Sequence, residues 1–355
     1  MGSDPASQGT PPGGPLQLAG EPPRVHLAPL PTPLHHLPRL SERLGIEVLC
    51  KRDDLTGSVL SGNKVRKLEY LLADARAVGA DTVVTCGGAQ SNHCRATALA
   101  AAQLGLGCRL LLRTDDPSVP PPLEGNLLLD RVAGADVRFI SRADYARRAE
   151  LLAEEVARLS TAGRVPYVIP EGGSNALGAW GYVRAVFELR SQLAAMQWRE
   201  TARDVTIVYA AGSGGTGAGL IAGAALADLE ARFVGFAVCD DAAYFQREIA
   251  RILAELAERF ALSRLQVPRE IEIVDEFVGV GYAKTRPEEL RTLVAVARAE
   301  GLVLDPVYTG KAMHGLCELQ RRTPGCLGTR VIFVHTGGVF GLLTAEHAGS
   351  LAPLV

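Results

Sequence analysis

The sequence predicts an α/β protein with one mainly parallel β-sheet or two such sheets. Short apolar segments typical of buried strands alternate with amphipathic helical segments from residue 46 to residue 343. The 355 residues, 47% of them hydrophobic, are enough for a core in two lobes. Ligands of parallel sheets bind at the carboxyl ends of strands. One cleft is therefore expected at the predicted strand ends that carry Gly-rich or Ser/Thr/Asn turns: 86–92, 171–178, 212–219, 279–282 and 335–341.

The predicted elements follow one another with short connections. Residues 24–45 are interrupted by prolines and are expected to wrap over the core. Apolar runs predict a strand within each of the segments 46–55, 80–88, 107–115, 136–141, 166–193, 205–229, 233–241 and 330–343. Helical periodicity predicts a helix that begins at Lys64 and helices within 89–106, 125–135, 144–163, 166–193, 205–229, 241–260, 287–301 and 302–321.

Composition restricts the partners and the compartment. The net charge of −2 gives no reason to expect nucleic acid or an anionic membrane, and no run of eighteen apolar residues predicts a membrane span. Seven irregularly spaced cysteines without a CxxC pair are typical of free thiols in a reducing cytoplasm, and no metal site is expected. Residues 1–23 are rich in Pro, Gly and Ser and are expected to form a disordered tail.

The plainest binding motif is the glycine-rich stretch from Gly212 to Gly217. It follows a strand and opens a helix, so its backbone N–H groups and the helix dipole suit a phosphate. The same stretch matches G-x-G-x-x-G, and Asp240 or Asp241 follows the next strand, where a ribose-binding acid would lie. An NAD-dependent dehydrogenase therefore remains an alternative, as does a glycine turn that serves only packing.

Other residue types at strand and helix ends suggest amino-acid chemistry. Lys64 stands at the start of a helix, where a cation is unfavourable unless its amine is chemically engaged. The turn from Ser91 to His93 begins another helix and suits a carboxylate. Tyr282 and Tyr308 lie in loop-like stretches, and Thr336 follows the last strand. A lysine, a phosphate loop, a carboxylate site and these hydroxyls together indicate pyridoxal phosphate acting on an amino acid.

Six motifs in order resemble the D-cysteine desulfhydrase and 1-aminocyclopropane-1-carboxylate deaminase family over about residues 24–350. They are "KRDDLTG…SGNKVRKLE", "GGAQSNH", "PYVIPEGGSNALGAWGY", "GSGGTGAGL", "LDPVYTGKAMHGL" and "HTGG". The resemblance implies the tryptophan synthase β-like fold type II, with two open twisted sheets and the cofactor, pyridoxal 5'-phosphate, between the lobes. It further implies a homodimer, a large domain of residues 24–63 and 176–355, and a small domain of residues 64–175.

The same resemblance assigns roles to residues of this chain. Lys64 would be the Schiff-base lysine, beside Asn63, and Thr336 would face the pyridine nitrogen. Tyr282 and Tyr308 would flank the substrate, with Tyr308 favoured for proton transfer. Asn92 would meet the ring hydroxyl, and the turn of Ser91, Asn92 and His93 would bind the substrate carboxylate. The phosphate would be held by Gly212, Ser213, Gly214, Gly215 and Thr216.

The resemblance favours β-elimination from D-cysteine, which yields pyruvate, hydrogen sulfide and ammonia. The ring-opening deaminases carry Glu at the position of Thr309, so the deaminase becomes an alternative. An L-cysteate sulfo-lyase and a pyridoxal-phosphate-binding protein without activity are further alternatives. One departure from the family pattern is Glu171, which replaces a small residue before the glycines of "PEGGSN".

Overall fold

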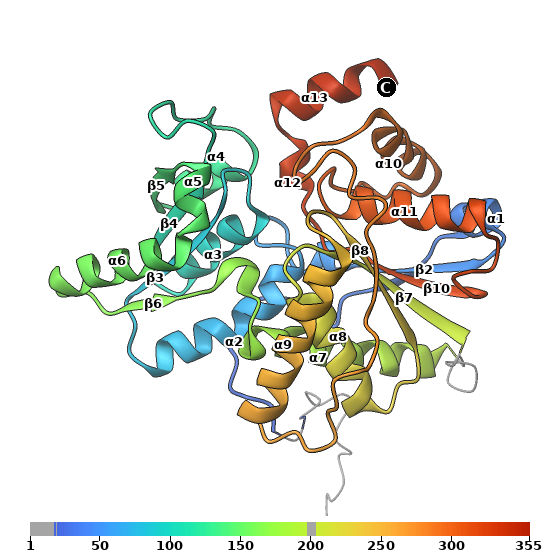
Figure 1. Cartoon of the computed structure of the whole chain (residues 1–355), viewed down its shortest axis with the longest axis horizontal. Coiled ribbons are helices and arrows are strands. Elements are labelled where there is room, and N and C mark those ends of the chain that lie inside the picture. The colour runs from blue at the N-terminus through green and yellow to red at the C-terminus, as the bar shows by residue number, and fades with distance from the viewer. Residues whose placement is uncertain (1–17, 19, 197–203) are drawn as a thin grey trace, which may run out of the picture.

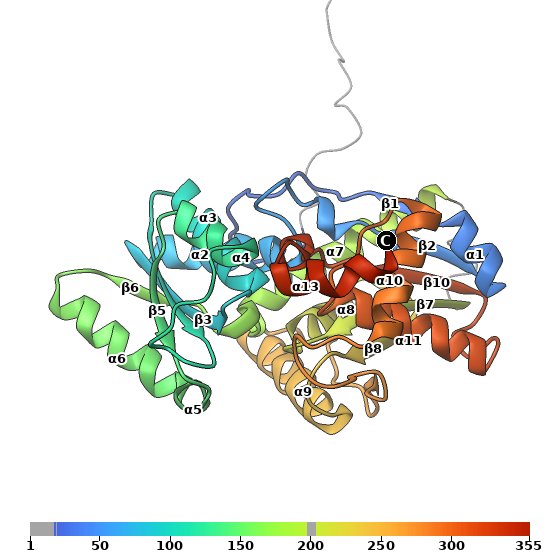
Figure 2. The ribbon, with the colours of Figure 1, turned by 90° about the horizontal axis from the view of Figure 1, so that it is seen from above.

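The computed structural model describes residues 18, 20–196 and 204–355, and its chain forms two lobes that lie side by side (Figures 1 and 2). Each lobe is built around its own sheet, and both sheets are mainly parallel, which confirms the predicted fold class. Most of the predicted tail lies outside the described residues. At its end, Glu21 accepts hydrogen bonds from Tyr70 and Arg184, so this part of the segment contacts the core. The domain bounds given above stay a prediction.

The larger lobe contains a six-stranded sheet in the order β1-β2-β10-β7-β8-β9. All its pairs are parallel except the edge pair, in which β1 runs antiparallel to β2. The central strand β7 is buried along its whole length, as expected for a sheet covered on both faces. The strands are β1 (Leu34–His36), β2 (Glu47–Lys51), β7 (Val205–Ala211), β8 (Arg232–Ala237), β9 (Glu272–Val274) and β10 (Arg330–Val334).

The smaller lobe contains a four-stranded, fully parallel sheet in the order β5-β4-β3-β6. Its strands are β3 (Thr82–Gly88), β4 (Gly107–Arg113), β5 (Asp136–Ile140) and β6 (Pro166–Val168). Helices of this lobe are α3 (Asn92–Gln103), α4 (Gly125–Val132), α5 (Arg142–Ala146) and α6 (Arg148–Thr161). In Figures 1 and 2, α6 lies at the end of the molecule farthest from the larger sheet.

Helices of the larger lobe cover both faces of its sheet (Figure 1). They are α1 (Pro38–Leu44), α7 (Ala176–Ala195), α8 (Gly215–Ala227), α9 (Ala242–Arg259), α10 (Pro287–Glu300), α11 (Thr309–Arg322), α12 (Val339–Leu342) and α13 (Ala345–Leu351). Short 3₁₀ turns occupy Asp53–Leu55, Glu171–Gly173 and Ala352–Leu354. No described helix is long and apolar enough to cross a membrane.

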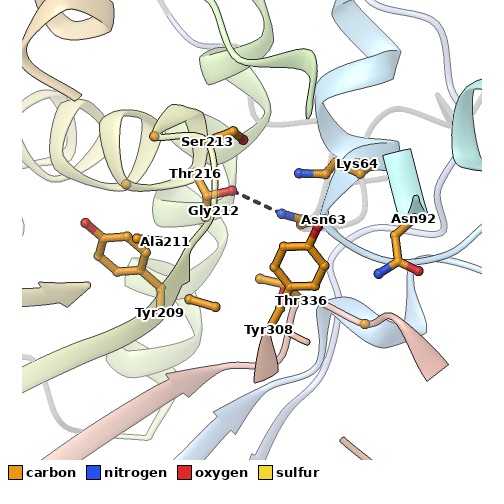
Figure 3. Close-up of a pocket in the computed structure, with 14 residues that line it drawn as sticks. Asn63, Lys64, Asn92, Tyr209, Ala211, Gly212, Ser213, Thr216, Tyr308 and Thr336 are labelled. Carbon is orange, nitrogen blue, oxygen red and sulfur yellow. Dashed lines mark hydrogen bonds between the residues drawn. The ribbon is translucent and has the colours of Figure 1, made fainter. Parts of the chain in front are cut away.

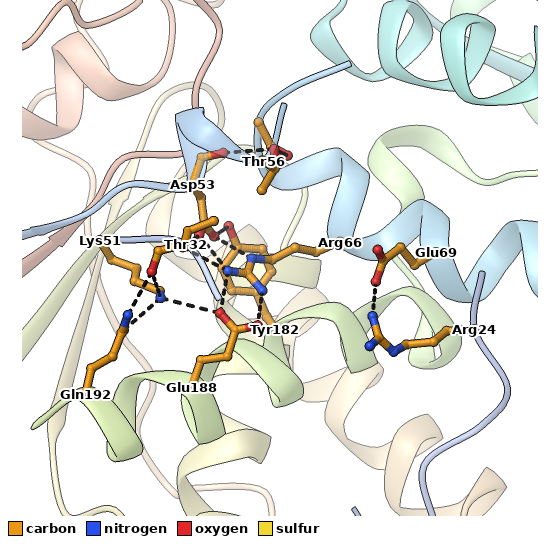
Figure 4. A network of polar contacts seen from close by, with 11 residues as sticks. Arg24, Thr32, Lys51, Asp53, Thr56, Arg66, Glu69, Tyr182, Glu188 and Gln192 are labelled. Atoms are coloured by element: carbon orange, nitrogen blue, oxygen red, sulfur yellow. Dashed lines mark hydrogen bonds and ion pairs between the residues drawn. The ribbon is translucent and has the colours of Figure 1, made fainter. Parts of the chain in front are cut away.

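Helix α2 (Asn63–Ala77) joins the two lobes and packs against α7 and α3. A buried polar network fixes its first turns (Figure 4). Arg66 donates to both carboxylate oxygens of Asp53 at 2.9 Å and to both oxygens of Glu188 at 2.9 Å. Tyr182 also donates to Asp53 at 2.6 Å. Because every charge is paired, the network orders the start of α2 without leaving an isolated buried ion.

Candidate active site

Most of the predicted site residues meet in one pocket at the carboxyl ends of the larger sheet (Figure 3). Its predicted members are Asn63, Lys64, Asn92, Gly212, Ser213, Gly214, Thr216, Tyr308 and Thr336. Ser91, His93 and Tyr282 line a wider cleft of about 1120 Å³, which shares Lys64 and Tyr308 with the pocket. Gly215 lines neither cavity. Tyr209 also lines the pocket, with a buried hydroxyl that has no partner among the described residues.

Lys64 lies in the first turn of α2, and its side chain points toward the glycine loop (Figure 3). The turn that precedes it requires glycine at position 62. Gly62 has a φ of 93°, and a Cβ there would lie 2.8 Å from the Thr336 carbonyl oxygen. Burial lowers the pKa of the Lys64 amine to about 8, although the Glu171 carboxylate raises it in part. A sizeable fraction of this amine is therefore neutral, and nucleophilic, near neutral pH.

The glycine loop connects β7 to α8 and leaves several backbone donors free. Gly214 precedes the helix with a φ of 80° and provides no side-chain cap. Within the described residues, no acceptor is bound by the backbone N–H groups of Ser213, Gly214, Thr216 and Gly217. The Thr216 hydroxyl accepts a hydrogen bond from the Asn63 amide at 3.1 Å, so its own proton is free to donate. This loop is therefore built to hold an anion.

Sequence reasoning missed two side chains behind this loop. The Lys67 amine donates to Ser174 Oγ at 3.2 Å, and Ser174 Oγ lies 2.8 Å from Ser213 Oγ. A Cβ at Gly215 would lie 2.9 Å from the Lys67 amine, so this amine adjoins the start of α8. Burial lowers its pKa well below the usual value, and the Lys64 charge adds to the effect. The spacing of three residues from Lys64 was the available signal, because it places both lysines on one helix face.

The start of α3 combines a filled cap with free backbone donors. Ser91 Oγ accepts a hydrogen bond from the Cys94 N–H at 3.2 Å. The backbone N–H groups of Asn92 and His93 have no acceptor among the described residues. The Asn92 oxygen accepts from the Asn126 amide at 3.0 Å, which leaves the Asn92 NH₂ group as a donor toward the pocket. A carboxylate at this turn would therefore meet backbone donors rather than the Ser91 hydroxyl.

His93 is oriented by a hydrogen-bond chain. Thr85 Oγ1 donates to the Ile169 carbonyl at 2.7 Å, so its contact of 2.9 Å with His93 Nε2 makes Nε2 the donor. Nδ1 is buried without a partner among the described residues, and burial holds the His93 pKa well below its usual value. The ring is therefore neutral with a free lone pair on Nδ1. Such a ring accepts a hydrogen bond at Nδ1 but gives no charge to a carboxylate.

Tyr282 and Tyr308 form a hydroxyl pair with an O···O distance of 2.7 Å. Burial raises the pKa of Tyr282 to about 12, and burial with the Tyr282 hydroxyl raises that of Tyr308 well above its usual value. Asp305 fixes the backbone at Tyr308 by accepting from the N–H groups of Val307, Tyr308 and Thr309. Both phenols are thus protonated at neutral pH and held in place.

Thr309 points away from the pocket and is fully buried. Its hydroxyl donates to Asp305 Oδ1 at 2.6 Å and accepts from the Asp305 N–H at 2.8 Å. Thr336, by contrast, lines the pocket, and its hydroxyl has no hydrogen-bond partner among the described residues. A hydroxyl, not a carboxylate, is therefore the free group that this end of the pocket offers to a ligand.

The sequence matches the pyridoxal-phosphate-dependent enzyme family over residues 25–337. This chain belongs to that family. Its loop after β7 is therefore part of a pyridoxal-phosphate fold and not of a dinucleotide fold, and Asp241, a candidate ribose ligand, instead caps α9 by accepting from the Tyr244 N–H. The resemblance found in the sequence is confirmed, as is the cofactor.

Several relatives of this pyridoxal-phosphate-dependent enzyme are similar over nearly the whole chain. A mitochondrial bifunctional D-cysteine desulfhydrase/1-aminocyclopropane-1-carboxylate deaminase of Arabidopsis thaliana is 45% identical, over 89% of this chain and 78% of its own. A D-cysteine desulfhydrase of Klebsiella pneumoniae is 40% identical, over 89% of this chain and 94% of its own. A solved 1-aminocyclopropane-1-carboxylate (ACC) deaminase homologue matches with a TM-score of 0.82 and 40% identity, covering 94% and 97% of the two chains.

The residues present fit pyridoxal phosphate. The loop of unpaired N–H groups before α8 matches a phosphate dianion, and the Lys67 amine adjoins it. The Lys64 amine is largely desolvated, as a covalent attachment to an aldehyde needs. The free Asn92 NH₂ group and the free Thr336 hydroxyl supply hydrogen bonds for the substituents of a polar ring.

Proposed function

We propose that this enzyme catalyses β-elimination on a β-substituted amino acid, with D-cysteine as the leading substrate and pyruvate, hydrogen sulfide and ammonia as products. One observation carries the proposal: a partly neutral lysine shares a single pocket with two helix ends that have free N–H groups. One helix end suits the phosphate of the cofactor, and the other suits the carboxylate of an amino acid. The names of the relatives support the choice of substrate.

Residues of this chain would hold the cofactor and the substrate together. Lys64 would bind the cofactor covalently, the Ser213–Gly217 loop would hold its phosphate, and Thr336 would donate to its ring nitrogen. The bound cofactor supplies an electron sink that acidifies the α-carbon proton of the amino acid. The N–H groups of Asn92 and His93 would orient the substrate carboxylate.

Proton transfer would fall to Lys64 and the tyrosine pair. The pKa of the Lys64 amine near 8 suits a base that takes the α-proton at neutral pH. Tyr308 and Tyr282 keep their protons because their pKa values are raised, so one of them can protonate the departing sulfur. The hydrogen bond between the two phenols lets the proton be replaced from the cleft side. Loss of the sulfur yields aminoacrylate, which water converts to pyruvate and ammonia.

Ring opening of ACC is the second candidate, because one relative is bifunctional and one solved structural neighbour is an ACC deaminase homologue. The hydroxyl of Thr336 disfavours it. A neutral partner does not enforce protonation of the ring nitrogen, so the electron sink is weaker, and ring opening has no sulfur leaving group to assist it. Replacing Thr309 by glutamate would remove both hydroxyl bonds to Asp305, at a buried position that does not line the pocket.

Product analysis tests the proposal. The cofactor-loaded protein is incubated with D-cysteine, L-cysteine, ACC and L-cysteate, and pyruvate, 2-oxobutanoate, sulfide and sulfite are measured. We expect equal amounts of pyruvate and sulfide from D-cysteine, at a rate above that of ring opening. Faster formation of 2-oxobutanoate would assign the deaminase. Sulfite release would assign the sulfo-lyase, and no product in the presence of bound cofactor would mean a binding protein without activity.

Location and assembly belong to the same proposal. All seven cysteines are free thiols, which supports a reducing compartment such as the cytoplasm. The homodimer rests on the family resemblance, and sedimentation of the cofactor-loaded protein tests it. A mass of one chain at working concentration would contradict the dimer.

A further inference from the structure

Three arginines line the wide cleft outside the pocket, and they differ in their partners. Arg148 forms an ion pair with Glu171 at 3.1 Å, and Arg251 forms one with Glu248 at 3.0 Å. The guanidinium of Arg113 forms no ion pair or hydrogen bond with any residue that the structure describes. A half-buried cation with unused N–H donors is costly unless an anion joins it. Arg113 is therefore the arginine of this cleft that is open to a ligand.

Two tyrosines, one from each lobe, hold the Arg113 side chain. Its guanidinium carbon lies 4.7 Å from the ring centre of Tyr145, which belongs to the smaller lobe. It lies 5.4 Å from the ring centre of Tyr282, which belongs to the larger lobe. Tyr145 is itself fixed by a hydrogen bond to Glu171. Stacking on rings leaves the N–H groups at the guanidinium edge free to bind an anion in plane.

The position of Arg113 relates it to the reacting part of the substrate. A Cβ built at Gly88 would lie 3.8 Å from Tyr282 Cε1 and 3.9 Å from Arg113 Nη2, so these groups meet beside the turn that leads into α3. The Tyr282 hydroxyl contacts the Tyr308 hydroxyl, and Tyr308 and Lys64 line both cavities. Since the free N–H groups of α3 suit the α-carboxylate, Arg113 is available for a second negative charge.

We propose that Arg113 binds the negative charge on the β-substituent of the substrate, so that the site selects amino acids whose β-substituent is an anion or departs as one. The inference rests on the proposed β-elimination. In that step the Cα–H proton passes to Lys64, and its electron pair forms the Cα–Cβ double bond. The Cβ–S bond breaks with both electrons on sulfur, which leaves as hydrosulfide from a thiol or as sulfite from a sulfonate. Arg113 stabilises that leaving anion.

The neighbouring charges are consistent with this role. Glu171 lies near Arg113 but is already bonded to Tyr145 and Arg148. Asp115, two residues further along the chain, is paired with Arg142 at 2.7 Å. Asp240 also lines the cleft, but it is exposed. None of these carboxylates is within ion-pair distance of the Arg113 guanidinium among the described residues.

The test compares substrates that release an anion with one that does not. Values of kcat/KM are measured for D-cysteine, for both enantiomers of cysteate and for ACC, which opens without a leaving group. We expect Arg113→Gln to lower kcat/KM for cysteate and cysteine by about 10- to 100-fold, the range for a hydrogen bond to a charged group. Ring opening should change less than about threefold. Arg113→Lys should retain part of the activity, since it keeps the charge but not the planar donors.

Arg131→Gln is the matched control, because Arg131 stacks on Phe139 in the same lobe at 6.0 Å, outside both cavities. It should leave all rates unchanged. An equal loss on cysteate and on ACC would overturn the proposal, because it would mean that Arg113 only holds Tyr282. No loss on either substrate would overturn it as well.

A binding measurement separates this inference from the proposed function. If the cofactor-loaded wild type converts none of these substrates, β-elimination fails, and calorimetric affinities for cysteate and alanine then decide the role of Arg113. We expect the wild type to prefer cysteate over alanine and Arg113→Gln to reduce that preference at least about tenfold. Equal affinity for the two amino acids in the wild type would refute the subsite itself.

Discussion

The helices α8 and α3 both begin at the active site, but their first turns differ. Gly214 gives α8 no side-chain cap, and four N–H groups of its loop have no acceptor among the described residues. Ser91 caps α3 and takes the Cys94 N–H, which leaves the two N–H groups of Asn92 and His93. A cap stabilises a helix but uses a donor that a ligand could take. The uncapped end thus suits a phosphate dianion, and the capped end a carboxylate.

The largest effect is expected when the lysine that shares the pocket with both helix ends is removed. Lys64→Ala should lower kcat by about a thousandfold, because the proposed base and the covalent link are lost together. Both anion sites remain, so phosphate binding should persist. Absorption of the bound cofactor near ~410–420 nm, before and after borohydride, checks the link. Lys284→Ala, at an exposed loop position, is the control. A cofactor that still becomes covalently attached to Lys64→Ala would transfer the assignment to another lysine such as Lys67.

The uncapped end of α8 is tested by adding a charge to it. Gly214→Asp should weaken pyridoxal phosphate binding about 10- to 100-fold relative to Gly214→Asn, because it adds a negative charge to the loop proposed to hold the phosphate. The two variants share the same size and the same positive φ, so only the charge differs. Dissociation constants from fluorescence titration of the cofactor-free variants give the comparison. Equal constants would remove this loop from the phosphate site.

Helix α4, which packs against α3, contains the buried acid Asp130. Neither oxygen of Asp130 has a hydrogen-bond partner among the described residues, and burial raises its pKa to about 8. In the unfolded chain the value is about 3.9. The folded state therefore binds the extra proton between these limits, and wild-type stability falls as pH rises from about 4 to about 8 and levels off above.

Asp130→Asn removes that proton dependence. Relative to the wild type, its free energy of unfolding should rise steadily between about pH 4 and pH 8 and keep a constant difference at higher pH. Urea unfolding at pH 5, 7 and 9 measures the two curves. Glu154→Gln, at an exposed position of α6, serves as the control. Parallel curves for wild type and Asp130→Asn would show that the carboxyl group is ionised in the folded protein.

The smallest effect is expected at the cap of α3. Ser91→Ala should reduce the free energy of unfolding by about 1 kcal/mol, the usual cost of losing such a cap. If the substrate carboxylate binds to backbone N–H groups, KM should rise no more than about threefold. Thermal unfolding and steady-state kinetics on one preparation separate the two quantities. A tenfold rise in KM with unchanged stability would mean that the hydroxyl itself contacts the substrate.

Residue types and spacing were enough to predict the alternating fold and most members of the pocket, but not Tyr209. Glycines after a strand, a lysine after "SGN" and a hydroxyl after the last strand are local signals, and the structure brings them together. The partners that tune these groups are not local. Asp53 and Glu188 of the α2 network are separated by more than a hundred residues of sequence, so only the folded chain reveals their pairing with Arg66.

The directions in which side chains point, like their distant partners, could not be predicted from the sequence. Thr309 begins α11 and Thr336 follows β10, yet the hydroxyl of one is bonded to Asp305 and the other residue lines the pocket. The tautomer of His93 depends on a threonine that donates to a third residue, Ile169. The antiparallel edge strand β1 was hidden in a proline-rich stretch that has no strand-like alternation.

The buried polar network at the start of α2 has a consequence for the stability of the site at high temperature. Burying Arg66 with Asp53 and Glu188 costs hydration free energy, and that cost shrinks on heating because the hydration of ions becomes less favourable. Apolar packing gains no comparable advantage. As the protein is warmed, the contacts that hold the start of α2 should therefore be among the last to weaken, and Lys64 would keep its orientation close to the melting point.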